Sequence, residues 1–66
     1  MKITLHVNGM TFESPTTNEM STEDAKSVIY ESIESMNKLE LECSDGSFVV
    51  IGEEALSNAI LVFSDK

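Results

Sequence analysis

Alternation of hydrophobic and polar residues predicts a β-hairpin at the start of the chain. Along residues 2–13, apolar and polar side chains alternate on either side of Asn8-Gly9. An Asn-Gly pair between alternating hydrophobics favours a two-residue type I′ turn, because both of its central positions need positive φ. Such a turn pairs Leu5 with Phe12 and separates the apolar and polar sets onto opposite faces.

A helical spacing of apolar residues follows the hairpin. Residues 14–20 are expected to form a loop in which Pro15 stops the second strand. Ser21 is the expected N-cap of a helix over residues 22–36, and Asn37 is its expected left-handed stop. The stripe predicted to face the core consists of Ala25, Val28, Ile29, Ser32, Ile33 and Met36.

The pattern of residues 38–43 and 47–51 predicts a second hairpin with its turn around Gly46. A loop of two or four residues pairs Cys43 with Phe48, which places Phe48 on the inner face. The outer face then carries two carboxylates and two apolar side chains, namely Glu40, Glu42, Val49 and Ile51.

The rest of the chain predicts a short helical turn at residues 52–58 and a last strand at residues 59–63. Because uninterrupted hydrophobicity is typical of strands buried on both faces, we expect this strand at the centre of the sheet. The predicted fold is α+β, ordered ββαβββ, with one amphipathic helix packed on one face of a four- to five-stranded mixed or antiparallel sheet. With its last strand beside the first, the order of elements resembles the ubiquitin-like layout, and this resemblance carries no function. We expect residues 1–66 to form a single compact domain.

Composition adds a strong negative charge to this picture. The chain carries 12 acidic and 4 basic side chains, a net charge of −8, and is 41% hydrophobic. That hydrophobic content separates it from acidic disordered chains and indicates a rigid acidic surface. The charge disfavours direct binding to nucleic acid and to anionic membranes. No apolar run reaches the roughly 20 residues of a membrane span, and a lone cysteine without a signal peptide favours the cytoplasm.

The candidate catalytic and metal-binding residues form no functional pattern. His6 is expected on an exposed strand face without an orienting partner, and Cys43 is expected to be buried with no neighbouring base in the sequence. One cysteine and one histidine do not make a zinc site, and Asp45 is not followed by the ligands of a calcium loop. We therefore expect no enzymatic activity, cofactor, metal or small-molecule ligand.

Binding to another protein is the better prediction. If Val49, Ile51 and half of the run at residues 59–63 cluster on the open face of the sheet, they form an apolar patch beside Glu40 and Glu42. Such a patch would mark an interface, unless residues 14–20 or 52–58 fold over it. On the predicted helix, Tyr30 lies among acidic residues, and tyrosine is enriched at binding hot spots. The candidate partner-binding residues are Glu23, Tyr30, Glu31, Glu34, Glu40, Glu42, Val49 and Ile51.

We accordingly expect a small acidic, non-enzymatic protein-interaction or regulatory module that binds a protein partner or a second copy of itself. Two alternatives stay open. One is a structural homo-oligomeric accessory subunit, such as a homodimer. The other is a nucleic-acid-mimicking inhibitor of a DNA- or RNA-binding protein, a class of small acidic proteins that fits a phage or mobile-element origin. The charge could also serve solubility alone.

Overall fold

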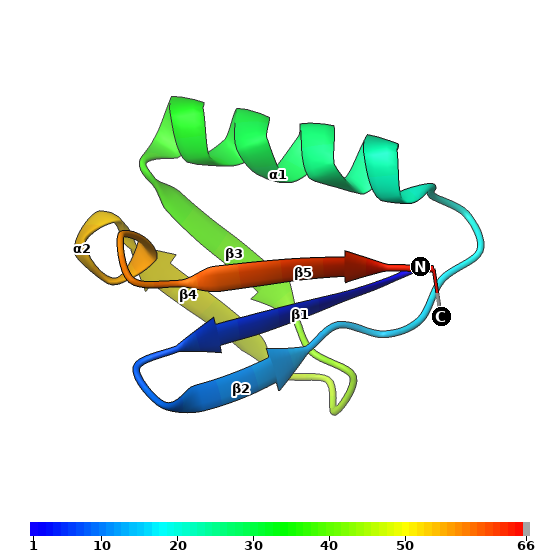
Figure 1. Ribbon diagram of the computed structural model, residues 1–66, viewed down its shortest axis with the longest axis horizontal. Coiled ribbons are helices and arrows are strands. Elements are labelled where there is room, and N and C mark those ends of the chain that lie inside the picture. Colours follow the sequence, from blue (N-terminus) through cyan, green and yellow to red (C-terminus); the bar gives the residue numbers. More distant parts are fainter. Residues whose placement is uncertain (66) are drawn as a thin grey trace.

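Within residues 1–65, five strands and two helices follow one another in the predicted order (Figure 1). The computed structural model describes residues 1–65, so Lys66, the last residue of the predicted domain, lies outside the described residues. The elements are β1 (Lys2–Val7), β2 (Met10–Glu13), α1 (Thr22–Met36), β3 (Lys38–Glu42), β4 (Phe48–Gly52), α2 (Glu53–Leu56) and β5 (Ile60–Ser64). The α+β class is confirmed. The strands are divided between two antiparallel sheets, one ordered β2-β1-β5 and the other formed by β3 and β4.

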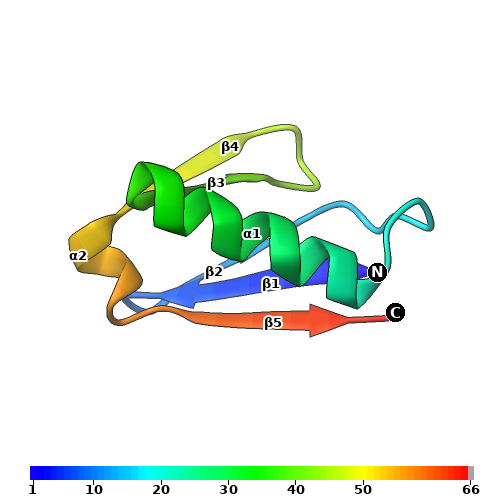
Figure 2. The same cartoon turned by 90° about the horizontal axis from the view of Figure 1, so that it is seen from above.

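The core lies between the two sheets and beneath α1. Figure 2 shows β3 and β4 on one side of the molecule and the three-stranded sheet on the other, with α1 running across the opening between them. Leu5 of β1 and Leu39 of β3 are fully buried at the centre. Each contributes about 1.5–3 kcal/mol of hydrophobic stabilisation. The buried apolar cluster is Met1, Ile3, Leu5, Val7, Ala25, Ile29, Leu39, Leu41 and Ile51.

The first hairpin forms as its sequence predicts. Asn8 and Gly9 both adopt positive φ, at 50° and 79°, and Leu5 pairs with Phe12. His6 is exposed on the outer face, where its Nδ1 lies 3.1 Å from Thr11 Oγ1. The observed register is the one that this turn and the alternation of apolar residues predict.

The segment after β2 is tied back to the start of β1. Buried Ser14 donates its backbone N–H to Ile3 O at 2.9 Å, and Ile3 donates its own N–H to Ser14 Oγ at 2.8 Å. The amino group of Met1 donates to Thr17 O at 2.6 Å, and Thr17 N–H donates to Met1 O at 2.9 Å. These bonds hold residues 14–17 alongside the beginning of β1.

Helix α1 has the predicted bounds and caps, but it buries a narrower stripe than its sequence suggests. Ser21 Oγ accepts the Asp24 N–H at 3.1 Å, and Asn37 ends the helix with φ 54°. Val28 and Met36, expected in the core, are about half exposed, at 51% and 47%. The reason is that α1 spans the opening between two sheets instead of lying on one broad sheet face.

The second hairpin differs from its predicted register by one residue. Three residues, 44–46, form its loop: Gly46 N–H donates to Cys43 O at 3.0 Å, and Cys43 N–H donates to Ser47 O at 2.7 Å. Gly46 adopts φ 90°, a left-handed conformation that suits glycine. Such a three-residue loop, a turn followed by a left-handed residue, is a common hairpin connection.

Because the loop has three residues instead of two or four, the side of β4 expected to face solvent faces the core, and the other side faces solvent. Because side chains alternate along a strand, a slip of one residue moves each of them to the opposite face. Val49 and Ile51, predicted outside, pair with Leu41 and Leu39 and face the core. Phe48, predicted inside, is exposed on the outer face.

Strand β5 lies beside β1, as predicted, but at the edge of its sheet and not at the centre. Its residues Ile60 and Val62 are exposed, at 63% and 43%. They share the outer face with His6 and Thr4, with which they pair. The uninterrupted apolar run therefore does not reflect burial on both faces: β1 is the central strand, and the outer side of this sheet is open.

Candidate protein-binding surface

The outer side of the β3–β4 hairpin combines exposed apolar and acidic side chains. We call it the mixed face and define it by Glu40, Glu42, Phe48 and Val50. Glu40 is the cross-strand neighbour of Val50, and Glu42 is that of Phe48. The exposed fraction is 69% for Phe48 and 59% for Val50, and both glutamates are exposed. Because Phe48 and Val50 are two residues apart on one strand, they form an exposed apolar patch, which makes the mixed face a candidate interface.

The hairpin that carries the mixed face is packed against the core through its inner side. On its inner side, Leu39, Leu41 and Ile51 are buried in the core, so the backbone beneath Phe48 and Val50 is fixed by packing. A binding surface that is already ordered loses little conformational entropy when a partner docks.

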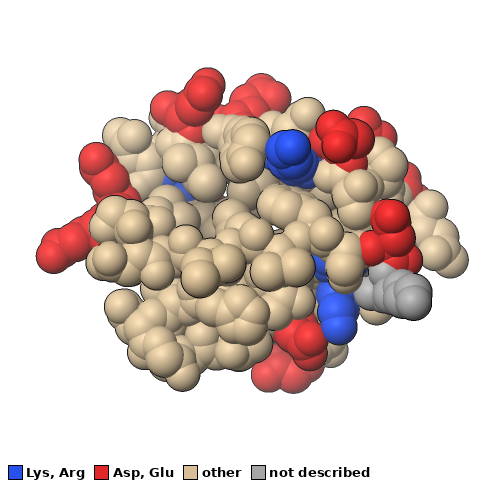
Figure 3. Space-filling model, viewed as in Figure 1, with Lys and Arg blue, Asp and Glu red and all other residues tan. Residues whose placement is uncertain are grey.

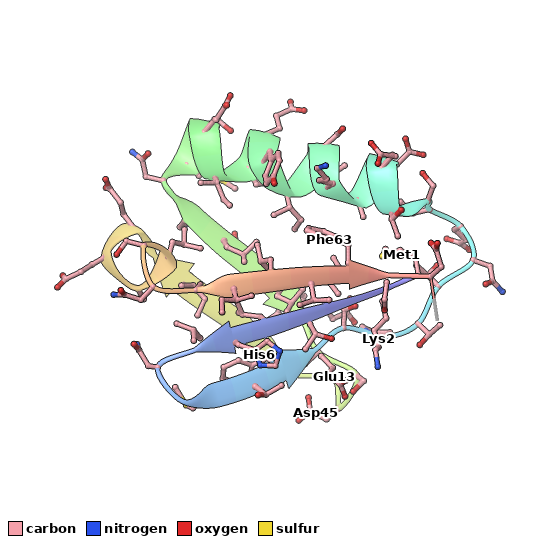
Figure 4. The ribbon with its side chains drawn as sticks, viewed as in Figure 1. Met1, Lys2, His6, Glu13, Asp45 and Phe63 are labelled. Carbon is pink, nitrogen blue, oxygen red and sulfur yellow. The ribbon has the colours of Figure 1, made fainter. Side chains whose placement is uncertain are left out.

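The turn at the end of the mixed face is also ordered. Ser47 donates its backbone N–H and its hydroxyl to Asp45 Oδ1, at 2.9 and 2.6 Å. The hydroxyl bond first, and then the backbone bond, lower the pKa of the Asp45 carboxyl below its ordinary value of 3.8. Figure 4 shows Asp45 at the tip of this loop. The loop therefore adds a further carboxylate, that of Asp45, which Gly46 and Ser47 separate from Phe48 along the chain.

Glu40 and Glu42 form no ion pair within the part of the chain that the structure describes, although Lys38 lies on the same face of β3. In residues 1–65, the one ion pair joins Lys2 Nζ to Glu13 Oε1 at 3.0 Å, on the other sheet (Figure 4). Glu40 and Glu42 therefore remain available to lysine or arginine side chains of a partner. Apolar anchors beside unpaired carboxylates are complementary to a basic surface that also presents apolar side chains.

The predicted candidates on the helix form a second, separate group. Glu23, Tyr30, Glu31 and Glu34 are all exposed on α1, and Tyr30 is 53% exposed. They lie on a different element from the mixed face. Of the eight predicted site residues, Glu40 and Glu42 share the mixed face, whereas Val49 and Ile51 turn inward and are replaced by Phe48 and Val50.

A third surface is the outer face of the three-stranded sheet. Its exposed apolar residues are Ile60 and Val62, beside Thr4 and His6. Figure 3 shows that uncharged residues dominate over β1, β2 and β5, while acidic side chains gather around the rim. The sequence predicts half of the apolar run at residues 59–63 on an open sheet face beside Val49 and Ile51. The structure exposes Ile60 and Val62, but on a different sheet from Val49 and Ile51, which face the core.

The candidate catalytic residues stay apart. Cys43 is a buried free thiol, whereas His6 is exposed on the opposite sheet, beside Thr11. Over residues 1–65, no group of three or more histidine, cysteine, aspartate or glutamate side chains is placed to hold a metal ion. Neither helix in this part of the chain has the length and apolar character needed to cross a membrane.

Comparisons with known proteins add no family to this description. No family model, no curated protein and no solved structure matches the chain. The exposed surfaces are therefore the features of the chain that point to a function.

Proposed function

We propose that this protein is a small non-enzymatic interaction module that binds a basic protein through the mixed face. The observation that carries the proposal is the exposure of Phe48 and Val50 on a rigid hairpin whose neighbouring strand presents Glu40 and Glu42. The partner would place apolar side chains against the ring and lysine or arginine side chains against the carboxylates.

The two kinds of side chain would contribute differently. Burial of Phe48, now 69% exposed, would supply affinity, since a fully buried phenylalanine contributes about 1.5–3 kcal/mol. The carboxylates, together with the net charge of −8, would mainly accelerate the encounter with a basic partner and set its orientation. We therefore expect binding that weakens as salt is added without disappearing.

We favour this function over imitation of nucleic-acid phosphates. A phosphate mimic needs carboxylates in a continuous row, whereas those of the mixed face are flanked by Phe48 and Val50. The apolar half of the surface fits contact with protein side chains.

The test compares variants of the mixed face with matched variants of α1. Phe48→Ser removes the exposed ring of the mixed face, and Tyr30→Ser removes a comparably exposed ring from the helix. Immobilised wild-type and variant proteins would be incubated with lysate of the source cells, and the retained proteins identified and compared. The expected result is a basic protein that Phe48→Ser loses and Tyr30→Ser keeps.

Two double variants show whether partner binding depends on the position of the carboxylates or only on the net charge of the protein. Glu40→Gln with Glu42→Gln, and Glu31→Gln with Glu34→Gln, each remove two negative charges. The first pair should reduce capture of the partner and the second should leave it nearly unchanged. Equal losses, or retention of the partner by Phe48→Ser, would refute the proposal.

A further inference from the structure

The outer edge of strand β4 has no feature that would prevent it from pairing with a strand of another chain. The strand pairs with β3 on one side, and its five residues, 48–52, include no charged residue and no proline. The other strand edges carry features that hinder pairing with a strand of another chain. Strand β2 is four residues long and is followed closely by Pro15, β3 carries three charged side chains, and β5 lies alongside α1.

The pairing pattern shows which backbone groups face this free edge. The bond from Cys43 N–H to Ser47 O marks those two residues as a hydrogen-bonded pair. Hydrogen-bonded and non-hydrogen-bonded pairs alternate along an antiparallel ladder. Val49 is therefore bonded to β3, whereas the backbone N–H and C=O groups of Phe48 and Val50 point away from β3.

We propose that β4 pairs antiparallel with β4 of a second copy, about a two-fold axis at Val50. The two hairpins then form one four-stranded sheet, and Phe48 and Val50 of both copies form a continuous apolar stripe on its outer side. This inference rests on the proposed function and deepens it, because the second copy completes the surface that receives the basic partner.

Charge explains why a second copy fits, although each copy carries −8. The two strands that meet are uncharged, and the first carboxylate beyond each of them is Glu53, at the start of α2. Glu40 and Glu42 lie on β3, so the carboxylates of the two copies stand three strand spacings apart, about 14 Å. This separation exceeds the Debye length of about 8 Å at physiological ionic strength, so the repulsion is largely screened.

The expected dimer is weak. An interface made of one strand pair and a narrow apolar stripe buries less accessible surface than the roughly 800 Å² per partner of a standard protein–protein interface. We therefore expect a reversible equilibrium that responds to protein concentration. Added salt should strengthen it by screening the residual repulsion, whereas added salt should weaken the binding of a basic partner.

Sedimentation velocity of the full chain, across a concentration series, tests the inference. The wild-type mass should rise from 7.3 kDa towards twice that value. Val50→Pro removes the N–H that faces the free edge and leaves the bonds to β3 in place, which an edge strand tolerates. It should weaken the dimer by about tenfold or more. Val50→Thr, which keeps this N–H and the branched shape, is the matched control and should dimerise nearly as the wild type does.

A wild-type chain that stays monomeric at all concentrations and salt levels would overturn the inference, as would a folded Val50→Pro variant that dimerises normally. Folding of the variant is checked by circular dichroism. If Val50→Pro does not fold, amide hydrogen exchange of the wild type replaces it. The Phe48 and Val50 amides should then exchange more slowly at high than at low protein concentration, and no change would refute the pairing. A monomeric wild type that still captures a basic protein refutes the dimer alone, whereas a dimer that captures none refutes the proposed function alone.

Discussion

Threonine substitutions at two adjacent positions of β4 should have very different effects on stability. Ile51 is 8% exposed and belongs to the buried cluster, whereas Val50 is 59% exposed on the mixed face. Threonine keeps the branched shape that suits a strand at both positions. The comparison therefore isolates burial from strand propensity.

The structure sets the size of the expected difference. Ile51→Thr removes two buried apolar carbons, which costs about 1.6 kcal/mol, and places a hydroxyl in the core, where desolvation costs about 1–3 kcal/mol. The sum is a loss of about 3–5 kcal/mol. Val50→Thr exchanges a methyl group for a hydroxyl largely in solvent, and should change stability by less than about 0.5 kcal/mol. A chain of 66 residues has a total stability of about 3–10 kcal/mol, so the first loss is severe.

Urea unfolding followed by far-ultraviolet circular dichroism measures both effects. At a slope near 1 kcal/mol per molar urea, Ile51→Thr should lower the midpoint by about 3 M or more, and Val50→Thr should leave it almost unchanged. Measurement at two protein concentrations separates any contribution from self-association. Equal losses, or a larger loss for Val50→Thr, would contradict the register of β3 and β4 and with it the mixed face.

Three further predictions concern other parts of the fold. Ser14→Ala should cost about 1–3 kcal/mol in urea unfolding, because it removes the hydroxyl that accepts the buried Ile3 N–H at 2.8 Å; an unchanged midpoint would show that water replaces it. Buried Cys43 should react with a thiol reagent far more slowly in the native protein than in urea, and equal rates would place it at the surface. Ser47→Ala should raise the Asp45 pKa back towards 3.8 in an NMR titration, and an unchanged pKa would refute the assigned cause. Since the folded pKa is lowered, the associated stabilisation is present above pH 3.8 and is lost as the pH falls through the folded value.

Local signals account for the parts of the fold that the sequence predicts well. The turn at Asn8-Gly9 and the caps Ser21 and Asn37 depend on residues close in the chain, and the structure confirms all of them. Each specifies a backbone conformation or a hydrogen bond that needs no distant partner.

The register of the second hairpin could not be predicted in the same way. Strand β4 carries large apolar residues on both faces, so it lacks the alternation that marks an inner side. Its turn around Asp45-Gly46 also suits loops of different lengths, and the three-residue loop decides the outcome. Strand β5 poses the same problem, because Leu61 and Phe63 pack on the core while Ile60 and Val62 face solvent. The exposed apolar residues are therefore the ones that pattern analysis misplaces.

Site-specific photocrosslinking in the source cells shows whether a partner binds to the mixed face. Benzoylphenylalanine would replace Phe48 on the mixed face, Tyr30 on α1 or Ile60 on the three-stranded sheet, all three of them exposed positions. We expect covalent adducts with a basic protein from position 48, and few or none from positions 30 and 60. Adducts that form from position 30 or 60 while position 48 gives none would contradict binding through the mixed face.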